Sequence, residues 1–451
     1  MHIERLRLKD VGPFDDVTID LAKGTDRQLA DVYLLTGPNG TGKSTILYAL
    51  ASVIAGNVAE LGRDLLVDRM RTRRGMAALY ADDATSLAAV LNDFTAENEL
   101  SAVGPFGGPT LPLNHRTGAL THLDSGGGWS RYSESAAQFL TQPVDARPKF
   151  DWAAFAYAGV RSVSDVQITS IQEPKQSPFD DSLSFVHTAD TGQLANWIAS
   201  QNFRRLKAKE AGHADRAEQL ARTIRDIESV VAQIVDDPDF GFVITDEDDD
   251  VRVRWKGVVV RLGLLPDGLK SIVSWIADLL MRLDRIPWQD ATPVLQRSFL
   301  LLLDEVDIHL HPAWQRKVLP LVQRMFPNAQ IIASTHSPFV VTSVDDAQII
   351  TLKLRGRASV VDSVTAPQIG HSYTAVLRSI FGIDSEFDID TEARLERFHA
   401  ARQRLLAGDA SARLDVDRLA DELARRSEEL REVVGLELGQ LHRQLNRRAA
   451  P

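Results

Sequence analysis

Near its amino end the chain reads Gly37-Pro38-Asn39-Gly40-Thr41-Gly42-Lys43-Ser44-Thr45. This stretch fills every fixed position of the phosphate-binding pattern G-x-x-x-x-G-K-[ST]. In such a loop the glycines let backbone N–H groups turn toward a β-phosphate, the lysine reaches the β- and γ-phosphate oxygens, and the next hydroxyl binds Mg²⁺. We therefore predict an ATP site with Ser44 as a magnesium ligand and the following contact residues: Asn39, Gly40, Thr41, Gly42, Lys43, Ser44 and Thr45.

The segments on either side of this loop have the character that a phosphate loop requires. Residues 31–36 (DVYLLT) are apolar and β-branched enough for a buried strand, and residues 45–50 (TILYAL) suit the start of a helix. The phosphates would then lie at a helix N-terminus. An ordinary glycine turn is the alternative, and the strand–loop–helix context disfavours it.

Composition limits the classes of protein that fit. The 451 residues allow two or three domains, or one large ATPase with insertions. A net charge of −11 argues against a generally cationic nucleic-acid binder, although a local basic groove is compatible with it. The chain has no cysteine, no apolar run of the roughly 18 residues that span a bilayer, and no signal-peptide core behind Met1. We expect a cytoplasmic protein without a membrane partner.

A second diagnostic region is Phe299-Leu300-Leu301-Leu302-Leu303-Asp304-Glu305, an apolar strand that ends in two carboxylates. In a phosphate-loop ATPase the first carboxylate, Asp304, would hold magnesium through water, and Glu305 would polarise the attacking water. The next expected strand, residues 330–335, delivers His336 at its carboxyl end. A histidine there can hydrogen-bond the γ-phosphate, and a buried structural histidine is the alternative.

Other segments are expected to surround these motifs. Residues 3–8 and 17–21 read as two strands of a front sheet around a turn at 12–16, and residues 191–235 have the apolar spacing of two antiparallel helices. Three further segments are notable, and two of them have open alternatives. The basic cluster 68–74 is a solvated surface or a phosphate contact, the Gly-rich stretch 104–128 marks loops with a peripheral hairpin, and the acidic run 246–250 is a hairpin turn or a metal site.

The residues around the second motif resemble a known family. They read Asp304-Glu305-Val306-Asp307-Ile308-His309-Leu310-His311-Pro312, followed by Trp314-Gln315-Arg316, Phe326-Pro327 and Thr335-His336-Ser337-Pro338. This resembles the ABC-type ATPases of the RecF/SMC/OLD group, and most closely the AAA-type subgroup of anti-phage systems that includes the ATPase subunits of Septu and retron systems. The resemblance covers residues 1–60 and 150–385. It implies a nucleotide-binding domain, two copies of which enclose two ATP molecules head to tail.

Two places depart from the pattern of the family. Relatives carry Leu-Ser-Gly-Gly or Leu-Ser-Asp-Gly, whose serine and backbone cap the γ-phosphate in the other protomer, but this chain has Leu265-Pro266-Asp267-Gly268. The resemblance assigns Asp267 and Gly268 to ATP in trans, while the proline offers neither hydroxyl nor N–H. Hydrolysis is therefore expected to be slow, or ATP serves mainly to hold one state. Gln172 is a candidate for the glutamine loop, in unremarkable surroundings.

Two other sets of residues suggest metal chemistry at first sight. His309 and His311 are spaced as a zinc pair could be, but the resemblance places His-Leu-His-Pro in the loop that crosses the dimer interface. Asp388 and Asp390 suggest the acidic pair of a Toprim nuclease, and the helical sequence around them lacks the α/β module that would carry it.

The end of the chain is predicted to be helical. Residues 391–407 would start behind Asp390 as the N-cap, and residues 412–446 repeat leucines at helical spacing. That stripe is either intramolecular core or a protomer or partner interface.

We expect an α/β fold: an ABC-type P-loop nucleotide-binding domain with a short helical insertion and a C-terminal helical extension. The expected divisions are 1–190 and 236–385 for the ATPase core, 191–235 for the insertion and 386–451 for the extension. Two functions remain open. The first is an ATPase that dimerises, or assembles further, on ATP and Mg²⁺ and controls an effector such as a nuclease in phage defence. The alternative is a repair or SMC-like ATPase that clamps DNA directly, through basic residues such as Arg204 and Arg205.

Overall fold

The computed structural model describes residues 2–21, 28–55, 61, 76–81, 86–91, 120–124, 129–159, 176–185, 191–244, 251–344, 346–367, 370–383, 385 and 387–449. The chain divides into two compact units, which we call the N-terminal unit, 1–376, and the C-terminal unit, 377–451. The boundary between them precedes position 386, where the helical extension was expected to begin.

The centre of the N-terminal unit is a six-stranded sheet with the order β14-β13-β3-β12-β11-β7. Neighbours from β13 to β7 run parallel, and β14 pairs antiparallel with β13. The middle strands are apolar because helices or strands cover both of their faces. The strands are β3 (Asp31–Thr36), β7 (Ala153–Tyr157), β11 (Phe299–Leu303), β12 (Ala329–Ser334), β13 (Ala347–Arg355) and β14 (Ala358–Thr365).

A second sheet of five antiparallel strands has the order β2-β1-β4-β5-β6. The turn between its first two strands is only Gly12-Pro13, shorter than the expected 12–16. Strands β4 and β5 were not expected, whereas β6 lies within the stretch 104–128 where a peripheral hairpin was expected. Residues 68–74, 104–119 and 125–128 lie outside the described residues. The strands are β1 (Ile3–Val11), β2 (Phe14–Asp20), β4 (Met76–Ala81), β5 (Ser86–Leu91) and β6 (Leu120–Asp124).

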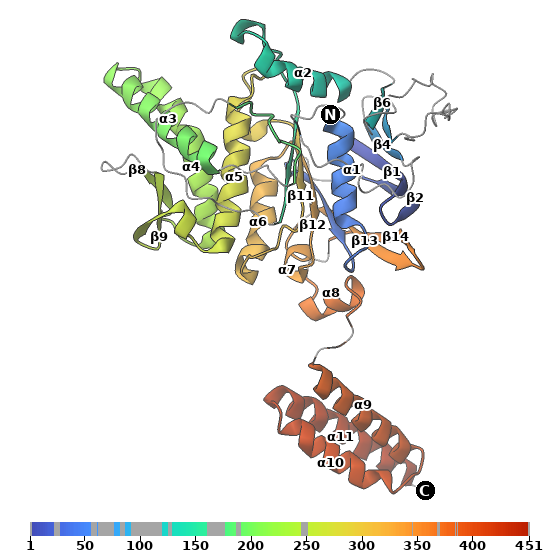
Figure 1. The fold of residues 1–451 in the computed structure, drawn as a ribbon. Helices are drawn as coiled ribbons and strands as arrows, with labels where there is room; N and C mark the ends of the chain where they lie inside the picture. Colours follow the sequence, from blue (N-terminus) through green and yellow to red (C-terminus); the bar gives the residue numbers. More distant parts are fainter. Residues whose placement is uncertain are drawn as a thin grey trace. The chain divides into compact units, whose positions relative to one another are not determined.

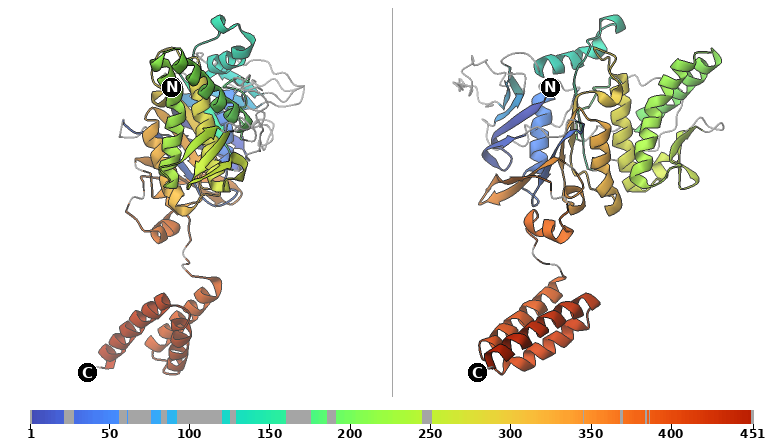
Figure 2. Two further views of the ribbon diagram at one scale, coloured as in Figure 1. Left: turned by 90° about the vertical axis from the view of Figure 1, so that its left-hand side faces the viewer. Right: turned by 180° about the vertical axis from the view of Figure 1, so that it is seen from behind.

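The helix α1 (Lys43–Ala55) lies between the two sheets, where it contacts β4 and β5 on one side and β7, β11 and β12 on the other. The opposite face of the six-stranded sheet is covered by α5 (Asp267–Arg285) and α6 (Pro312–Met325), with a helical hairpin farther out (Figures 1 and 2). The rings of Tyr157 in β7 and Trp275 in α5 are 6.2 Å apart across this contact. This layered arrangement confirms the expected α/β fold class.

The hairpin consists of α3 (Thr191–Glu210) and α4 (Ala214–Val235), the two antiparallel helices expected over 191–235. A three-stranded antiparallel sheet follows, formed by β8 (Gly241–Ile244), β9 (Val251–Trp255) and β10 (Val258–Arg261). The first two of these strands form the expected hairpin around the acidic run, and residues 245–250 themselves lie outside the described residues.

Short helices complete the described elements. They are α2 (Trp129–Thr141), α7 (Pro338–Val341) and α8 (Tyr373–Ser379), with single 3-10 turns η2 (Val144–Ala146), η3 (Leu262–Leu264) and η4 (Val294–Gln296).

The C-terminal unit is built from α9 (Ile389–Leu406), α10 (Ala412–Ala424) and α11 (Glu428–Ala449). One expectation needs correction here, and one open alternative is decided. The first helix begins behind Asp388 instead of Asp390, because the Asp388 carboxylate accepts the N–H groups of Asp390 (3.1 Å) and Thr391 (3.0 Å). The leucine-rich stretch 412–446 is broken at 425–427, and its stripe is the core of this unit, formed by residues that include Leu419, Leu423, Leu430 and Leu441.

Candidate nucleotide site

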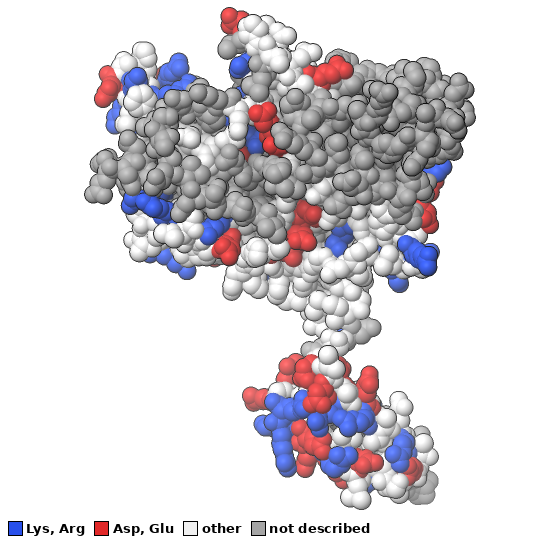
Figure 3. All heavy atoms as spheres, viewed as in Figure 1, with Lys and Arg blue, Asp and Glu red and all other residues white. Residues whose placement is uncertain are grey.

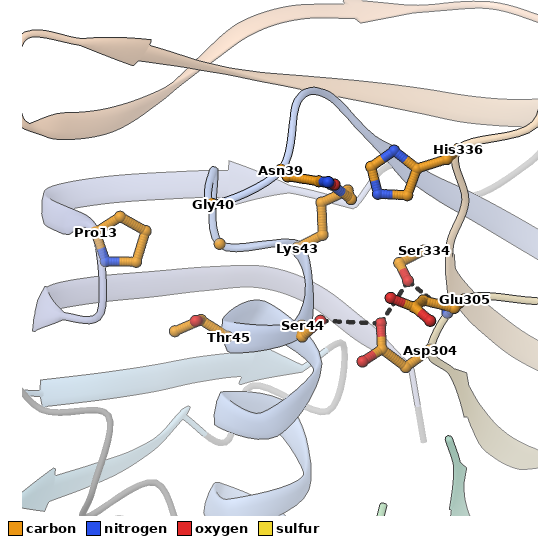
Figure 4. A pocket seen from close by; sticks show the side chains of 11 residues that line it. Pro13, Asn39, Gly40, Lys43, Ser44, Thr45, Asp304, Glu305, Ser334 and His336 are labelled. Atoms are coloured by element: carbon orange, nitrogen blue, oxygen red, sulfur yellow. Dashed lines mark hydrogen bonds between the residues drawn. The ribbon is translucent and has the colours of Figure 1, made fainter. Parts of the chain in front are cut away.

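A cavity of about 330 Å³ lies where the phosphate loop faces the carboxyl ends of β11 and β12 (Figure 4). Carboxyl ends of parallel strands are where open α/β sheets place their ligands. Residues from four separate stretches of the sequence line it: Pro13, Asn39, Gly40, Gly42, Lys43, Ser44, Thr45, Asp304, Glu305, Ser334 and His336.

The loop 37–45 has the curled backbone that phosphate binding requires. Gly40 and Gly42 have φ values of 80° and 90°, a region that side-chain-bearing residues rarely adopt. The buried Lys43 Nζ donates to the carbonyls of Gly37 (2.9 Å) and Pro38 (3.1 Å). Burial lowers the pKa of Lys43, although nearby carboxylates oppose the shift. The ammonium therefore lies inside the loop. Thr41, predicted as a contact residue, is buried within the loop and does not line the cavity; its hydroxyl donates to the Pro38 carbonyl (2.8 Å).

Two oxygen groups at the base of the cavity fit a magnesium ion. The Ser44 hydroxyl donates to Asp304 Oδ1 at 3.1 Å. Mg²⁺ usually keeps several waters, so Ser44 can bind the metal directly while Asp304 holds it through one of those waters, as expected from the sequence. The hydroxyl and carboxylate are also hard oxygen ligands of the kind that Mg²⁺ prefers.

Ser334, at the end of β12, is a site residue that sequence reasoning missed. Its hydroxyl donates to Asp304 Oδ1 (2.5 Å) and accepts the N–H of Glu305 (2.7 Å), so one side chain fixes both carboxylate-bearing residues (Figure 4). The available signal was its position, directly before Thr335-His336 at the end of an apolar strand. Pro13, in the β1–β2 turn, was missed as well.

Glu305 has a backbone conformation that is unusual for its type. Its φ of 48° lies in the left-handed region, where a non-glycine residue in a functional site commonly stores strain. Burial raises the pKa of Glu305, and the negative charges of Asp304 and Asp307 raise it further, while Lys43 opposes them. The carboxylate is thus more basic than an ordinary glutamate, as a group that accepts a proton from water should be.

His336 reaches the cavity from the segment after β12 (Figure 4). Burial lowers the pKa of His336, and the positive charge of Lys43 lowers it further. Asp307 holds this segment in place, because its Oδ1 accepts the Thr335 hydroxyl (2.6 Å) and the His336 N–H (3.3 Å). The imidazole can therefore act as a neutral hydrogen-bonding group near the phosphates.

Asp267 and Gly268 do not line this cavity; they form the first turn of α5. Asp267 is exposed and pairs with Lys270 (3.4 Å). Gly268 packs on the loop after Glu305 so closely that an added Cβ would lie 2.5 Å from the His309 carbonyl oxygen. Pro266 is the N-cap of α5 and gives it no side-chain hydrogen bond. Their assignment to ATP of another protomer stays a prediction.

Three of the residues considered for other metal chemistry, His311, Asp388 and Asp390, have structural partners. His311 is the N-cap of α6, and its Nδ1 accepts the Ala313 N–H (3.2 Å). Asp390 pairs with Arg394 and Arg426 in the C-terminal unit. Within the described ranges, no group of three or more His, Asp or Glu side chains is placed to hold a metal ion. Gln172 and the acidic run 246–250 lie outside those ranges.

Two protein-family models match the chain. One, described as "AAA domain, putative AbiEii toxin, Type IV TA system", matches residues 157–342, and the other, described as "AAA domain", matches residues 5–76. The retron Ec83 probable ATPase of Escherichia coli is 39% identical over 104 residues, which are 23% of this chain and 19% of that protein. The Septu protein PtuA of Bacillus thuringiensis is 22% identical over 396 residues, 85% of this chain and 84% of that one.

These matches confirm the resemblance to the AAA-type ATPases of Septu and retron systems. An SMC head bound to the C-winged helix domain of ScpA covers 82% of this chain and 98% of its own, with a TM-score of 0.47 and 15% identity. This chain spans about a fifth of the length of the retron ATPase and 84% of that of PtuA. No helix among the described residues is long and apolar enough to cross a membrane.

Proposed function

We propose that this SMC/RecF-like ATPase binds ATP with Mg²⁺, hydrolyses it slowly, dimerises on ATP and thereby regulates an effector, such as a nuclease, in an anti-phage complex. One observation carries the proposal. A single cavity brings Lys43 and Ser44 of the phosphate loop together with Asp304, Glu305 and His336, which lie more than 250 residues farther along the chain.

Each of these residues has a role that follows from its position. Lys43 and the loop N–H groups bind the β- and γ-phosphates at the N-terminus of α1, while Ser44 and Asp304 would hold Mg²⁺. The bound metal neutralises phosphate charge and orients the γ-phosphate. Glu305 polarises the attacking water and takes its proton, and His336 donates a hydrogen bond to the γ-phosphate.

Slow hydrolysis is supported by the start of α5. Pro266 stands where relatives carry the capping serine, and it gives α5 no side-chain cap. A missing donor to a transferring phosphate removes part of the electrostatic stabilisation of the transition state. The site then favours a long-lived ATP-bound state.

Dimerisation is supported by the positions of Asp267 and Gly268, which lie outside the cavity of their own chain. Asp267 and Gly268 are absent from the lining of their own site, and Gly268 packs directly on the loop that begins at Glu305. In a head-to-tail pair this surface would complete the γ-phosphate site of the partner. The packing of Gly268 on the loop that begins at Glu305 would then connect the catalytic loop of one ATP site with the residues that cap the ATP of the other site.

A light-scattering experiment tests this assembly. Glu305→Gln keeps the size of the side chain but removes the base, so the variant should dimerise stably with ATP and Mg²⁺ and stay monomeric with ADP. Lys43→Ala is the matched control, because it should abolish ATP binding while leaving the fold intact. A Glu305→Gln protein that binds ATP and remains monomeric at micromolar concentration would contradict the trans site.

The effector is proposed to supply the nuclease chemistry. Highly purified protein should leave plasmid and linear DNA intact with Mg²⁺ or Mn²⁺, with and without ATP. Cleavage that persists through purification and is lost in Asp388→Ala would instead place a nuclease in this chain. Stable binding of duplex DNA by the ATP-bound Glu305→Gln protein would favour the alternative, a DNA clamp.

A further inference from the structure

The side chain of Gln315 bridges two segments that border the candidate nucleotide site. Gln315 lies in the first turn of α6, within the Trp-Gln-Arg stretch 314–316 to which the proposed function gives no role. Its Nε2 donates to the carbonyls of Asp307 (3.0 Å) and Leu310 (2.9 Å), and its Oε1 accepts the Ser337 hydroxyl (2.7 Å). The two N–H groups and the oxygen of the amide are therefore all used. The opposite orientation of the amide would place its oxygen against two carbonyl oxygens, so these partners fix its orientation.

One end of this bridge is the loop that follows Glu305. Residues 307–310 form a tight turn in this loop, closed by a hydrogen bond from the Leu310 N–H to the Asp307 carbonyl (3.2 Å). Gln315 donates to the first and the last carbonyl of the turn, so it links the whole turn to α6. A loop that is bound at both ends of its turn has a defined position on the helix.

The other end of the bridge is the segment from which His336 reaches the cavity (Figure 4). Ser337 follows His336 directly, and its hydroxyl donates to the Gln315 oxygen. Asp307 binds the same segment from the other side, because its Oδ1 accepts the His336 N–H (3.3 Å). His336 thus lies between two links, and both of them lead to the turn 307–310.

Anchoring of α6 is the simpler role for such a glutamine, and the helix has a separate anchor. Gln323, about two turns farther along α6, is buried and donates to the Ala30 carbonyl (3.0 Å). Ala30 precedes β3, whose other end leads into the phosphate loop, so this contact lies away from the cavity. Gln315 differs because its partners belong to two segments that each supply a residue of the cavity lining, Glu305 or His336.

We propose that Gln315 is a positioning residue for ATP hydrolysis: its amide links the segment of His336 to the turn 307–310 and so holds the imidazole where it meets the γ-phosphate. Gln315 itself does not line the cavity, so it acts through His336. The γ-phosphate contact rests on the proposed function. The bridge does not, because protein groups alone form it. An experiment without nucleotide therefore separates a failure of the bridge from a failure of the ATPase.

Nuclear magnetic resonance of the full chain without ATP tests the bridge directly. Burial and the charge of Lys43 hold the pKa of His336 below its usual value, although Asp307 and Asp304 oppose the shift. Gln315→Met keeps the length of the side chain and removes all three hydrogen bonds. The imidazole of His336, assigned by the signal that His336→Gln removes, should then titrate closer to its usual pKa, because the released segment is more exposed.

The rate of hydrolysis is a second readout. At saturating ATP the rate of the Gln315→Met protein should fall about tenfold, as a misplacement of about 1 Å can cause. ATP affinity should stay nearly unchanged, because the phosphate loop is untouched. In a His336→Ala protein the same substitution should change the rate by no more than about twofold, because one residue acts through the other. Gln323→Met is the matched control on the same helix, and it should change neither the His336 titration nor the rate.

Gln315→Glu cuts the bridge at one end only. Its carboxylate can still accept the Ser337 hydroxyl, but at about pH 8 it is ionised and has no hydrogen to donate to the turn 307–310. Because the bridge fails when either end is cut, this variant should lose hydrolysis as Gln315→Met does.

Circular dichroism and ATP affinity check that each variant is folded. The proposal would be overturned by a His336 titration that is the same in the wild-type and Gln315→Met proteins, or by an equal loss of rate in Gln323→Met. A tenfold loss that persists in the His336→Ala background would overturn it as well, since Gln315 would then act through another group. A shifted titration in a wild-type background that does not hydrolyse ATP would support the bridge and contradict the proposed function.

Discussion

Gly159 lies against the proposed catalytic carboxylate and leaves no room for a side chain. A Cβ at this position would be 2.6 Å from the Glu305 Cβ and 3.2 Å from Ile308 Cγ2. Gly159→Ala should therefore displace Glu305 while leaving Lys43 and Ser44 in place. A displacement of about 1 Å is enough to lower the rate of a chemical step by about ten- to a hundredfold. We expect that loss in the rate of ATP hydrolysis with nearly unchanged ATP affinity. Normal hydrolysis in a folded Gly159→Ala protein would show that Glu305 tolerates the added methyl group.

At this scale the sequence predicts the residues that recur in fixed local patterns. Lys43 and Ser44 belong to one motif, and Asp304 and Glu305 end an apolar strand, so their roles could be read from neighbours in the chain. Ser334 and Gly159 could not, because each matters through a contact with a residue about 30 or 150 positions away. Such contacts depend on strand order, which no local pattern specifies.

At the scale of elements, Asp284 joins three helices. Its carboxylate in α5 accepts the Gln201 amide of α3 (3.1 Å) and the Thr223 hydroxyl of α4 (3.0 Å). Burial raises the pKa of Asp284, although the hydrogen bond from Thr223 and the charges of Arg204 and Arg285 oppose the shift. The folded state therefore holds this proton more tightly than the unfolded state does.

The sign of the pH dependence follows from that shift. The contribution of Asp284 to stability is complete below the pKa of the unfolded state and is lost as the pH rises through the higher pKa of the folded state. In the Asp284→Asn variant the side-chain amide oxygen can still accept the hydrogen bond from the Thr223 hydroxyl, but it carries no charge. As the pH rises from about 4 to about 7, the free energy of unfolding of the Asp284→Asn variant, measured by urea unfolding, should therefore decrease less than that of the wild type. Parallel pH profiles would show that the Asp284 carboxylate is solvated.

Element boundaries show where local patterns compete. Asp388 and Asp390 are both plausible N-caps. Asp390 pairs with Arg394 one turn later in the same helix and with Arg426 of another segment, which leaves the cap to Asp388. The break at 425–427 had a local signal, because the Ser427 hydroxyl accepts the Leu430 N–H (3.1 Å), as an N-cap does. The strands β4 to β6 lack the alternation of polar and apolar residues that marks a half-buried strand, so periodicity did not reveal them.

At the scale of the whole molecule, the two compact units have separate cores. Figure 3 shows Lys and Arg mixed with Asp and Glu over the surface of the C-terminal unit. The apolar side chains of its helices form the core of that unit. Leu423 is fully buried in that core. Leu423→Ala should lower the free energy of unfolding of this unit by about 2–5 kcal/mol through a cavity. Urea unfolding followed by circular dichroism should show an earlier helical transition, with unchanged ATP affinity. A loss of ATP affinity in the same protein would mean that the two units unfold as one.

The strand order of the central sheet also determines when an ATP site can exist during synthesis. β3, which leads into the phosphate loop, has β12 and β13 as its neighbours, and both are encoded about 300 residues later. Gln330 further exchanges hydrogen bonds with the backbone of Ile3 (2.9 and 2.8 Å). A ribosome that adds 5–20 residues per second needs roughly 15–60 s to cover that interval. Throughout this time the nascent chain carries a finished nucleotide motif beside an unpaired apolar strand. ATP therefore cannot guide the early folding of this protein, and the exposed edges of β3 need protection until the last third of the chain has emerged.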